Sequence, residues 1–214
     1  MPSSPYWGRG FVRPAAMLLS VLILAACGGG GGSDGTTAQN PPPLDAKASQ
    51  LCGYEVGAQR LTGLVISVHD GDTVRIRGSG TGNGTEHSVR LDGIDAPELS
   101  QAFGAQSQAA LSAQVLNQSV QVAYSKTDQY GRIVGAVFTQ DCEYANLHQV
   151  QAGLAWFYRA YQCELASATR AAFSLAEDQA QQGALGLWAQ GAPVAPWVYR
   201  NGVDPAVPTC ANQG

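Results

Sequence analysis

Apolar and polar positions alternate along several short stretches in the middle of the chain, and this pattern predicts β-strands. The first stretch is apolar and β-branched, whereas the next two alternate apolar with polar side chains, as half-buried strands do. A glycine-rich segment, residues 78–84, is expected to turn the chain between the second and third stretches. The predicted strands are residues 64–68, 74–77, 87–91, 120–125 and 133–139.

Helical periodicity follows the third and the fifth of these strands. Residues 103–117 are rich in Ala and Gln, and residues 146–153 form a shorter helical pattern. Residues 165–182 end at Gly183, a typical helix stop. Their expected buried stripe comprises Leu165, Ala168, Ala172 and Leu175. Five strands with about three helices predict an α+β fold, a five-stranded OB-type Greek-key β-barrel with the helices packed outside.

The first 26 residues have the features of a lipoprotein signal peptide. Arg9 and Arg13 precede an apolar run that is too short to span a bilayer as a helix. The run ends in Leu24-Ala25-Ala26-Cys27, which resembles a bacterial lipobox, so Cys27 is expected to be lipidated. The alternative is an ordinary signal peptide cleaved nearby. The lipobox predicts an exported, membrane-anchored lipoprotein that faces the periplasm or the cell exterior.

The mature chain is expected to contain one tether and one domain. Residues 27–50 are rich in Gly and Pro and predict a flexible tether, and residues 51–210 have the length of a single domain. The domain has an even number of cysteines, which in an exported protein indicates disulfides. They are Cys52, Cys142, Cys163 and Cys210. We expect the pairs 52–210 and 142–163; free thiols are the alternative, and the spacing disfavours zinc.

Two short acidic runs stand out in a chain with few carboxylates. Of the 16 Asp and Glu residues, five lie in residues 70–73 and 90–98, on either side of a strand pattern. A strand meander would bring Asp72 and Asp95 to one end of the sheet, where two carboxylates repel unless a cation lies between them. Oxygen ligands select a hard ion such as Ca²⁺ or Mg²⁺. Taken singly, each run has a structural explanation as a hairpin turn or a helix entry.

The acidic runs, together with the later segment Asp128-Gln129-Tyr130-Gly131-Arg132, resemble the staphylococcal nuclease (thermonuclease) family in order and spacing. The likeness continues through residues 153–156 and 186–188 to Pro196-Trp197-Val198-Tyr199-Arg200, and so covers most of residues 60–200. The resemblance implies the same barrel fold. It also implies a metal-dependent phosphodiesterase, an endonuclease that hydrolyses DNA, RNA or both with Ca²⁺ as its cofactor.

Chemistry and the family correspondence assign the same metal-binding roles. Asp72 and Asp95 are the expected ligands, with the backbone carbonyl of Ala96 as a third. The founding member of the family has Thr at this third position, so a carbonyl contact would survive in this chain whereas a side-chain hydroxyl contact would not. Asp70 is expected to act through water or to orient Asp72.

The remaining expected roles concern the substrate. Glu98 is placed to take a proton from the attacking water, and Arg90 and Arg132 are placed to pair with phosphate oxygens. For each arginine alone, a surface salt bridge is the alternative. Three tyrosines are candidate nucleotide contacts, with hairpin closure or core packing as their alternatives. They are Tyr130, Tyr158 and Tyr161.

Net charge is the feature that fits a nuclease least well. The chain has 12 basic and 16 acidic residues, and loss of the signal peptide would leave ten basic residues and a net charge of −6. The non-specific electrostatic attraction to long nucleic acid is therefore expected to be weak, which favours local recognition of one phosphodiester. A catalytically silent binding module or a structural surface lipoprotein on the same scaffold is the alternative to an enzyme. No protein partner is evident, and a monomer is expected.

Overall fold

The computed structural model describes residues 52, 59–79 and 84–211. The expected signal peptide, Cys27 and the tether up to residue 50 lie outside these residues and stay predictions. The helices within the described ranges include none with the length and apolarity that a bilayer span requires.

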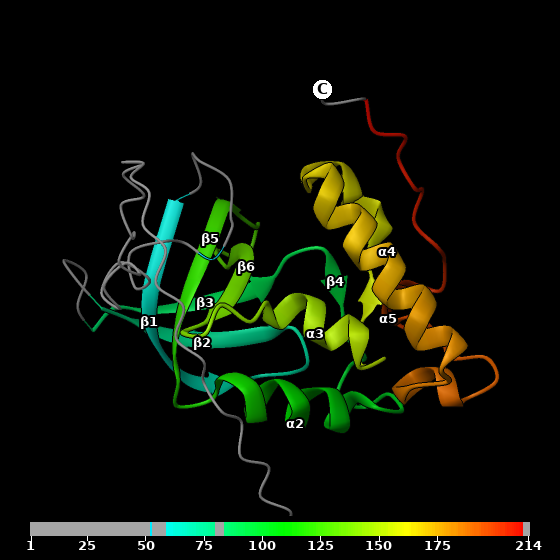
Figure 1. Cartoon of the computed structure of the whole chain (residues 1–214), viewed down its shortest axis with the longest axis horizontal. Helices are drawn as coiled ribbons and strands as arrows, with labels where there is room; N and C mark the ends of the chain where they lie inside the picture. Colours follow the sequence, from blue (N-terminus) through cyan, green and yellow to red (C-terminus); the bar gives the residue numbers. More distant parts are fainter. Residues whose placement is uncertain (1–51, 53–58, 80–83, 212–214) are drawn as a thin grey trace, which may run out of the picture. The chain divides into compact units, whose positions relative to one another are not determined.

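Five strands close into a barrel in the order β1-β2-β3-β6-β5 (Figure 1). Neighbours pair antiparallel except β3 and β6, which run parallel and close the barrel. The strands are β1 (Gln59–Val68), β2 (Thr73–Gly78), β3 (Glu86–Leu91), β5 (Ser119–Thr127) and β6 (Ile133–Thr139). All five predicted strands and the α+β barrel fold are therefore confirmed.

Helices pack against the barrel and against one another. The α-helices are α2 (Gly104–Val115), α3 (Ala145–Gln151), α4 (Ser167–Gln182) and α5 (Pro196–Asn201), and the 3₁₀-helices are η1 (Arg159–Glu164) and η2 (Gly186–Ala189). Helix α3 contacts β6 on one side and α4 on the other, and α2 contacts β1 (Figure 1). The three predicted helices are confirmed with slightly shorter bounds, and α5 is an additional helix near the C-terminal end of the described residues.

The buried stripe of α4 differs from the predicted one. The side chains that face the interior are Phe173, Ala176, Glu177 and Ala180, whereas Ala168 and Leu175 are exposed. Phe173 anchors the helix because its ring packs 5.6 Å from the ring of Phe157. Of the predicted stripe, Leu165 is buried as expected. The rest of the prediction was wrong because the chosen stripe was offset from the face that carries Phe173.

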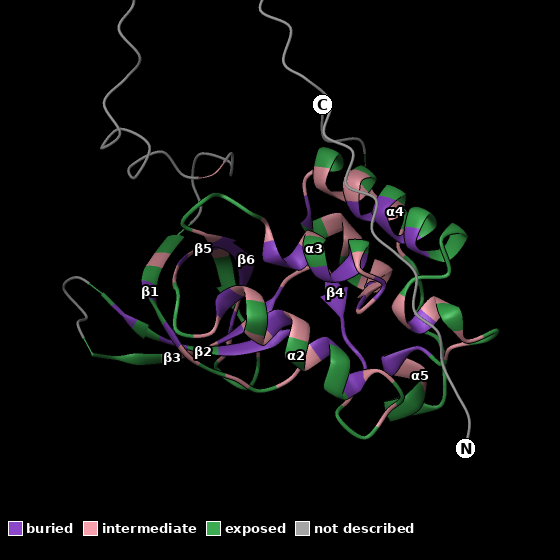
Figure 2. Cartoon of the chain, turned by 60° about the horizontal axis from the view of Figure 1, so that its bottom comes forward, coloured by how far each residue is buried: buried purple, intermediate pink, exposed green. Residues whose placement is uncertain are grey.

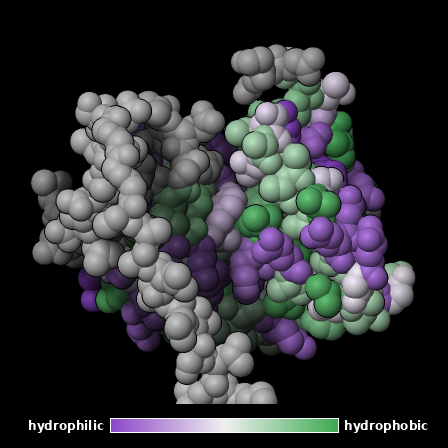
Figure 3. Space-filling model, viewed as in Figure 1, coloured by the Kyte–Doolittle hydropathy of each residue, from purple (hydrophilic) through white to green (hydrophobic). Residues whose placement is uncertain are grey.

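The core lies inside the barrel and under α2. Alternate residues of β2 and β3 point inward, and Leu111 and Val115 of α2 are fully buried one turn apart. Figure 2 shows these buried positions along β2 and the short strand β4 (Ile94–Asp95). On the face drawn in Figure 3, hydrophobic and hydrophilic side chains are interspersed over α4.

Two disulfides connect the four cysteines, but not in the predicted pairs. Cys52 is bonded to Cys142 and Cys163 to Cys210, with sequence separations of 90 and 47 residues. The C-terminal segment runs along η1, where Gln162 Nε2 donates to the carbonyl oxygen of Pro208 at 2.8 Å. Each end of the domain is thus tied to an internal segment, the turn at Cys142 or the 3₁₀-helix η1, and not to the other end. The order of the cysteines in the sequence could not predict which of them lie close together in the fold.

Replacing Cys163 and Cys210 by serine should lower the free energy of unfolding by about 2–4 kcal/mol, because the crosslink restricts the unfolded chain. The Cys52→Ser/Cys142→Ser pair should cost a similar amount, and chemical denaturation of the three proteins measures both losses. If the oxidised wild type and the double variants unfold at the same denaturant concentration, the disulfides do not stabilise the domain.

Candidate active site

The first acidic run forms the tight turn between β1 and β2. Asp70 Oδ1 accepts a hydrogen bond from the backbone N–H of Asp72 at 3.0 Å, so Asp70 orients that segment. Gly71 is packed too closely for a side chain, since a Cβ there would overlap the Ser107 hydroxyl and lie 2.7 Å from the Ala96 Cβ. Gln149 of α3 holds the turn from below by donating to the Gly71 carbonyl at 2.7 Å. Glycine therefore lets the acidic turn approach the segment that carries Ala96.

The second acidic run begins on β3, where the strand register places Arg90 opposite Thr73. The chain then turns at Gly93, whose φ of 69° lies in the left-handed region that favours glycine. The preceding Asp92 is fixed by Asn146 Nδ2 of α3, which donates to its carboxylate at 2.7 Å. Asp95 follows on β4, which pairs with β7 (Trp156–Phe157). This turn brings Asp95 back to the end of the barrel where Arg90 lies.

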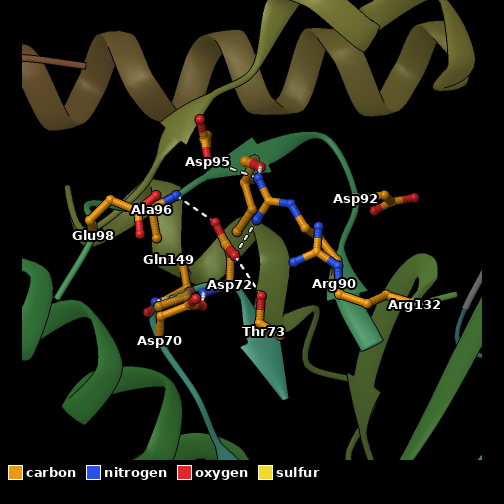
Figure 4. A network of polar contacts seen from close by, with 12 residues as sticks. Asp70, Asp72, Thr73, Arg90, Asp92, Asp95, Ala96, Glu98, Arg132 and Gln149 are labelled. Atoms are coloured by element: carbon orange, nitrogen blue, oxygen red, sulfur yellow. Dashed lines mark hydrogen bonds and ion pairs between the residues drawn. The ribbon is translucent and has the colours of Figure 1, made fainter. Parts of the chain in front are cut away.

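One arginine joins the two predicted metal ligands. Arg90 Nη1 pairs with Asp72 Oδ1, and its Nη2 pairs with Asp95 Oδ1 at 2.8 Å. Asp72 Oδ2 also accepts the backbone N–H of Ala96 at 2.7 Å, and Figure 4 shows Asp72 at the centre of these contacts. The Arg90 side chain is only 17% exposed, so a surface salt bridge is the wrong interpretation of this residue.

Burial and charge shift the pKa values of the acidic turn in opposite directions. Burial alone would raise the pKa of the Asp72 carboxyl, but the Arg90 guanidinium and the hydrogen bonds from Ala96 and Thr73 together outweigh burial and hold the pKa below its usual range. Burial, reinforced by repulsion from Asp72, raises the pKa of Asp70 to about 6. Asp72 is therefore firmly ionised, whereas the neighbouring Asp70 resists ionisation. A bound cation would reduce the repulsion between the two carboxylates.

Asp70→Asn should stabilise the metal-free protein by about 3 kcal/mol at neutral pH, since the carboxyl pKa rises from near 4 to about 6 and one pKa unit corresponds to about 1.4 kcal/mol. The raised pKa means that Asp70 keeps its proton in the folded state up to pH about 6, whereas an unfolded Asp loses it near pH 4. The folded state is therefore penalised progressively from about pH 4 to 6 and fully above that range. Urea unfolding in chelator at acidic and neutral pH measures the gain, and a gain that is independent of pH would contradict the assignment.

The donor set of the site fits a hard divalent cation. Asp72 and Asp95 approach the same guanidinium, and their oxygens and the Ala96 carbonyl are ligands that such ions prefer. Within the described part of the chain, no cluster of three or more His, Cys, Asp or Glu side chains is arranged to hold a metal. Two carboxylates would therefore share the ion with backbone oxygen and water.

An open pocket of about 850 Å³ contains every predicted metal-binding, catalytic and substrate residue. These lining residues are Asp70, Asp72, Arg90, Asp95, Ala96, Glu98, Tyr130, Arg132, Tyr158 and Tyr161. Arg132 lies in the loop before β6 and pairs through Nε with Asp128 Oδ2 at 2.7 Å. Tyr130 and Tyr161 are exposed by 74% and 53%, which excludes core packing for Tyr161 and leaves both rings accessible to a ligand.

Sequence reasoning missed several charged residues of the pocket, among them Arg200, which contacts predicted site residues. Arg200 of α5 pairs with Asp95 Oδ2 and with Glu98 Oε1, each at 2.6 Å. Its segment was noted as part of the family likeness, but nothing in the local pattern indicated a contact with residues about one hundred positions earlier. The pocket also contains Lys126, which pairs with Glu164 at 2.5 Å and lies over the Tyr161 ring.

A closed OB-type barrel that gathers buried carboxylates and arginines in one open pocket has the groups that hydrolysis of a phosphodiester requires. Comparisons with known proteins agree with this chemistry. Residues 88–190 match the family described as "Staphylococcal nuclease homologue". The chain is 35% identical over 139 residues to an uncharacterized endonuclease of Escherichia coli, an alignment that covers 65% of this chain and 84% of that protein.

Two further relatives carry nuclease names. A micrococcal nuclease of Shigella flexneri is 34% identical over 146 residues, covering 64% of this chain and 79% of the relative. A probable staphylococcal-like nuclease of Oryza sativa subsp. japonica is 36% identical over 115 residues, covering 54% of this chain and 33% of the relative. The chain belongs to the staphylococcal nuclease family and is a nuclease.

Proposed function

We propose that this protein is a Ca²⁺-dependent endonuclease that hydrolyses phosphodiester bonds of DNA or RNA outside the cytoplasm, by in-line attack of water. The observation that carries the proposal is the buried Asp72–Arg90–Asp95 group, which lies beside Glu98 in an open pocket. Family membership supports a metal-dependent nuclease, and the all-oxygen donor set suits a hard ion such as Ca²⁺ or Mg²⁺. Ca²⁺ is proposed because the family resemblance implies it.

The arginines are proposed to bind the phosphate. A planar guanidinium can donate two parallel hydrogen bonds to phosphate oxygens and stabilise the charge that builds up during displacement. Arg132 is 30% exposed and lines the pocket, so its guanidinium is accessible to a phosphate. Arg90 is more buried and is fixed by two carboxylates, which gives its position in the pocket little freedom.

Glu98 is proposed to be the general base. Its side chain is 36% exposed on the loop that follows β4, within the pocket that also holds Arg90. A carboxylate there can accept the proton of an attacking water molecule. Asp72, Asp95 and the Ala96 carbonyl would hold the cation, which when bound supplies Lewis-acid polarisation of the phosphate.

The acidic balance of the pocket is consistent with local recognition. More acidic than basic side chains line it, so a phosphodiester would approach favourably only after a cation has been bound. Tyr158 and Tyr161 lie with ring centroids 5.3 Å apart and offer aromatic faces on which a base can stack. Recognition of one or two nucleotides by these groups requires no broad basic surface.

A DNA-containing gel assay with and without Ca²⁺ tests the proposal most directly. The wild type should clear the gel in Ca²⁺ and leave it intact in chelator. Asp72→Asn should weaken Ca²⁺ binding in calorimetry together with cleavage, because it removes an anionic ligand and keeps its shape. An intact gel in both conditions would instead favour a catalytically silent binding or structural lipoprotein, and unchanged Ca²⁺ affinity in Asp72→Asn would refute the ligand assignment.

The extracytoplasmic location rests on the N-terminal sequence and on the disulfides of the domain, which persist in oxidising compartments. Cys27→Ala should release the protein from the membrane fraction or block its processing, since the acylated cysteine is the proposed anchor. Fractionation of cells that express wild type and variant measures this. Normal processing with unchanged membrane retention would contradict the lipoprotein assignment.

A further inference from the structure

Arg200 makes the closest charged contacts of the proposed general base. Its Nη1 donates to Glu98 Oε1 at 2.6 Å. The same guanidinium donates two hydrogen bonds to the Asp95 carboxylate, at 2.6 and 3.2 Å. Among the described residues, Arg200 is the one side chain that pairs with the Glu98 carboxylate. The arginine therefore links the proposed base directly to a proposed metal ligand.

The position of Arg200 is built by the packing of α5. Trp197, one turn earlier, stacks on Tyr158 with ring centroids 5.1 Å apart and donates through its indole N–H to Asp204 at 2.8 Å. The Tyr199 hydroxyl lies 3.1 Å from the Ser100 hydroxyl, on the loop that follows Glu98. The helix is thus fixed on both sides of the arginine, which distinguishes Arg200 from an unanchored surface cation.

Three carboxylates and two guanidinium groups alternate across the pocket. Arg90 lies between Asp72 and Asp95, and Arg200 lies between Asp95 and Glu98. Without Arg200, Asp95 and Glu98 would repel each other and Glu98 would turn toward solvent. Arg200 therefore has two effects of opposite sign. It keeps Glu98 in the pocket, and it adds positive charge beside the proposed cation site, which disfavours the cation.

We propose that Arg200 is a positioning residue of the nuclease reaction, which holds Glu98 beside Asp95 so that the base faces the reacting phosphate. The inference rests on the proposed function. It makes the C-terminal helix part of the active site, although that helix contributes no predicted metal ligand, base or phosphate-binding arginine.

Steady-state cleavage of a short oligonucleotide by full-length Arg200→Gln and Arg200→Lys tests the role. Arg200→Gln should lower kcat by roughly 10- to 100-fold with little change in KM, since misplacing a reacting group by about 1 Å can cost about 10²-fold. Arg200→Lys should recover part of the loss. Arg77→Gln is the matched control, because Arg77 of β2 forms an exposed pair with Glu86 of β3 and the substitution removes the same charge.

A double-mutant cycle shows whether Arg200 acts through Glu98. Once Glu98→Gln has removed the base, adding Arg200→Gln should cause no further loss of kcat. Independent, multiplying losses would overturn the inference and indicate direct contact with substrate. If Arg200→Gln does not fold, the same cycle is measured with Arg200→Lys.

Calorimetry with Ca²⁺ alone separates positioning from simple anchoring of α5. Loss of a positive charge beside Asp95 should tighten Ca²⁺ binding by roughly tenfold, whereas loosening of the site would weaken it. Weaker binding together with a lowered melting temperature would overturn the inference. An inactive wild type would remove the proposed function and this inference together, whereas an active wild type with an equally active Arg200→Gln would remove this inference alone.

Discussion

Arg90→Gln is expected to lower the free energy of unfolding by about 3–5 kcal/mol, the typical effect of removing one partner from a buried ion pair. Arg90 is the common partner of Asp72 and Asp95, which are 4% and 1% exposed. A neutral side chain would leave the buried Asp72 carboxylate without an ionic partner, and Asp95 would keep only Arg200 as its partner. Denaturant unfolding in chelator measures the loss without any contribution from a bound cation.

The same substitution should reduce kcat by at least about 10²-fold, the usual effect of removing a donor aimed at transition-state charge. Arg90→Lys keeps the charge but loses the two-pronged fork, so one carboxylate would lose its partner and both effects should persist in weaker form. Arg77→Gln serves as the control, since an exposed pair contributes only about 0–1 kcal/mol. Wild-type stability and turnover in Arg90→Lys would remove Arg90 from the proposed active site.

Glu98→Gln should lower kcat by about 10²–10⁴-fold, the range that a general base contributes. The stability of the fold should change little, because the side chain is partly exposed and the glutamine carbonyl can still accept a hydrogen bond from Arg200. Initial rates on a defined oligonucleotide, with parallel thermal melts, separate the two effects.

Glu86→Gln is the control for Glu98, since Glu86 pairs with Arg75 and Arg77 on the barrel surface and does not line the pocket. Its turnover should match that of the wild type. Wild-type turnover in Glu98→Gln would assign proton transfer to another group and leave Glu98 with an electrostatic role.

The barrel was predictable because a strand that is buried on one face must alternate, and β2 and β3 do so clearly. The gathering of Asp72 and Asp95 followed from the same reasoning, since both acidic runs lie at the ends of predicted strands. Helix α4 was found but its buried face was not. Packing against Phe157 selected the face that carries Phe173, and a single-helix pattern contains no information about that partner.

Local sequence patterns could not predict the contacts between segments that lie far apart in the chain. The disulfide partners depend on which loops the closed barrel brings together, and four cysteines permit three pairings. Arg200 reaches Asp95 across 105 residues, and its segment differs little in composition from an ordinary surface helix. Local sequence therefore predicted that the acidic residues beside the strands would lie together, and missed the arginine supplied by the far end of the domain.

The way in which α5 returns to the pocket has a practical consequence for recombinant fragments. The family match spans residues 88–190, a convenient pair of cloning boundaries. A fragment cut there would lack β1, β2, Cys52 and Asp72 at one end and Arg200 and Cys210 at the other. Cys142 and Cys163 would both lose their disulfide partners. Expression plasmids for biochemical work should therefore encode the domain from Cys52 through Cys210.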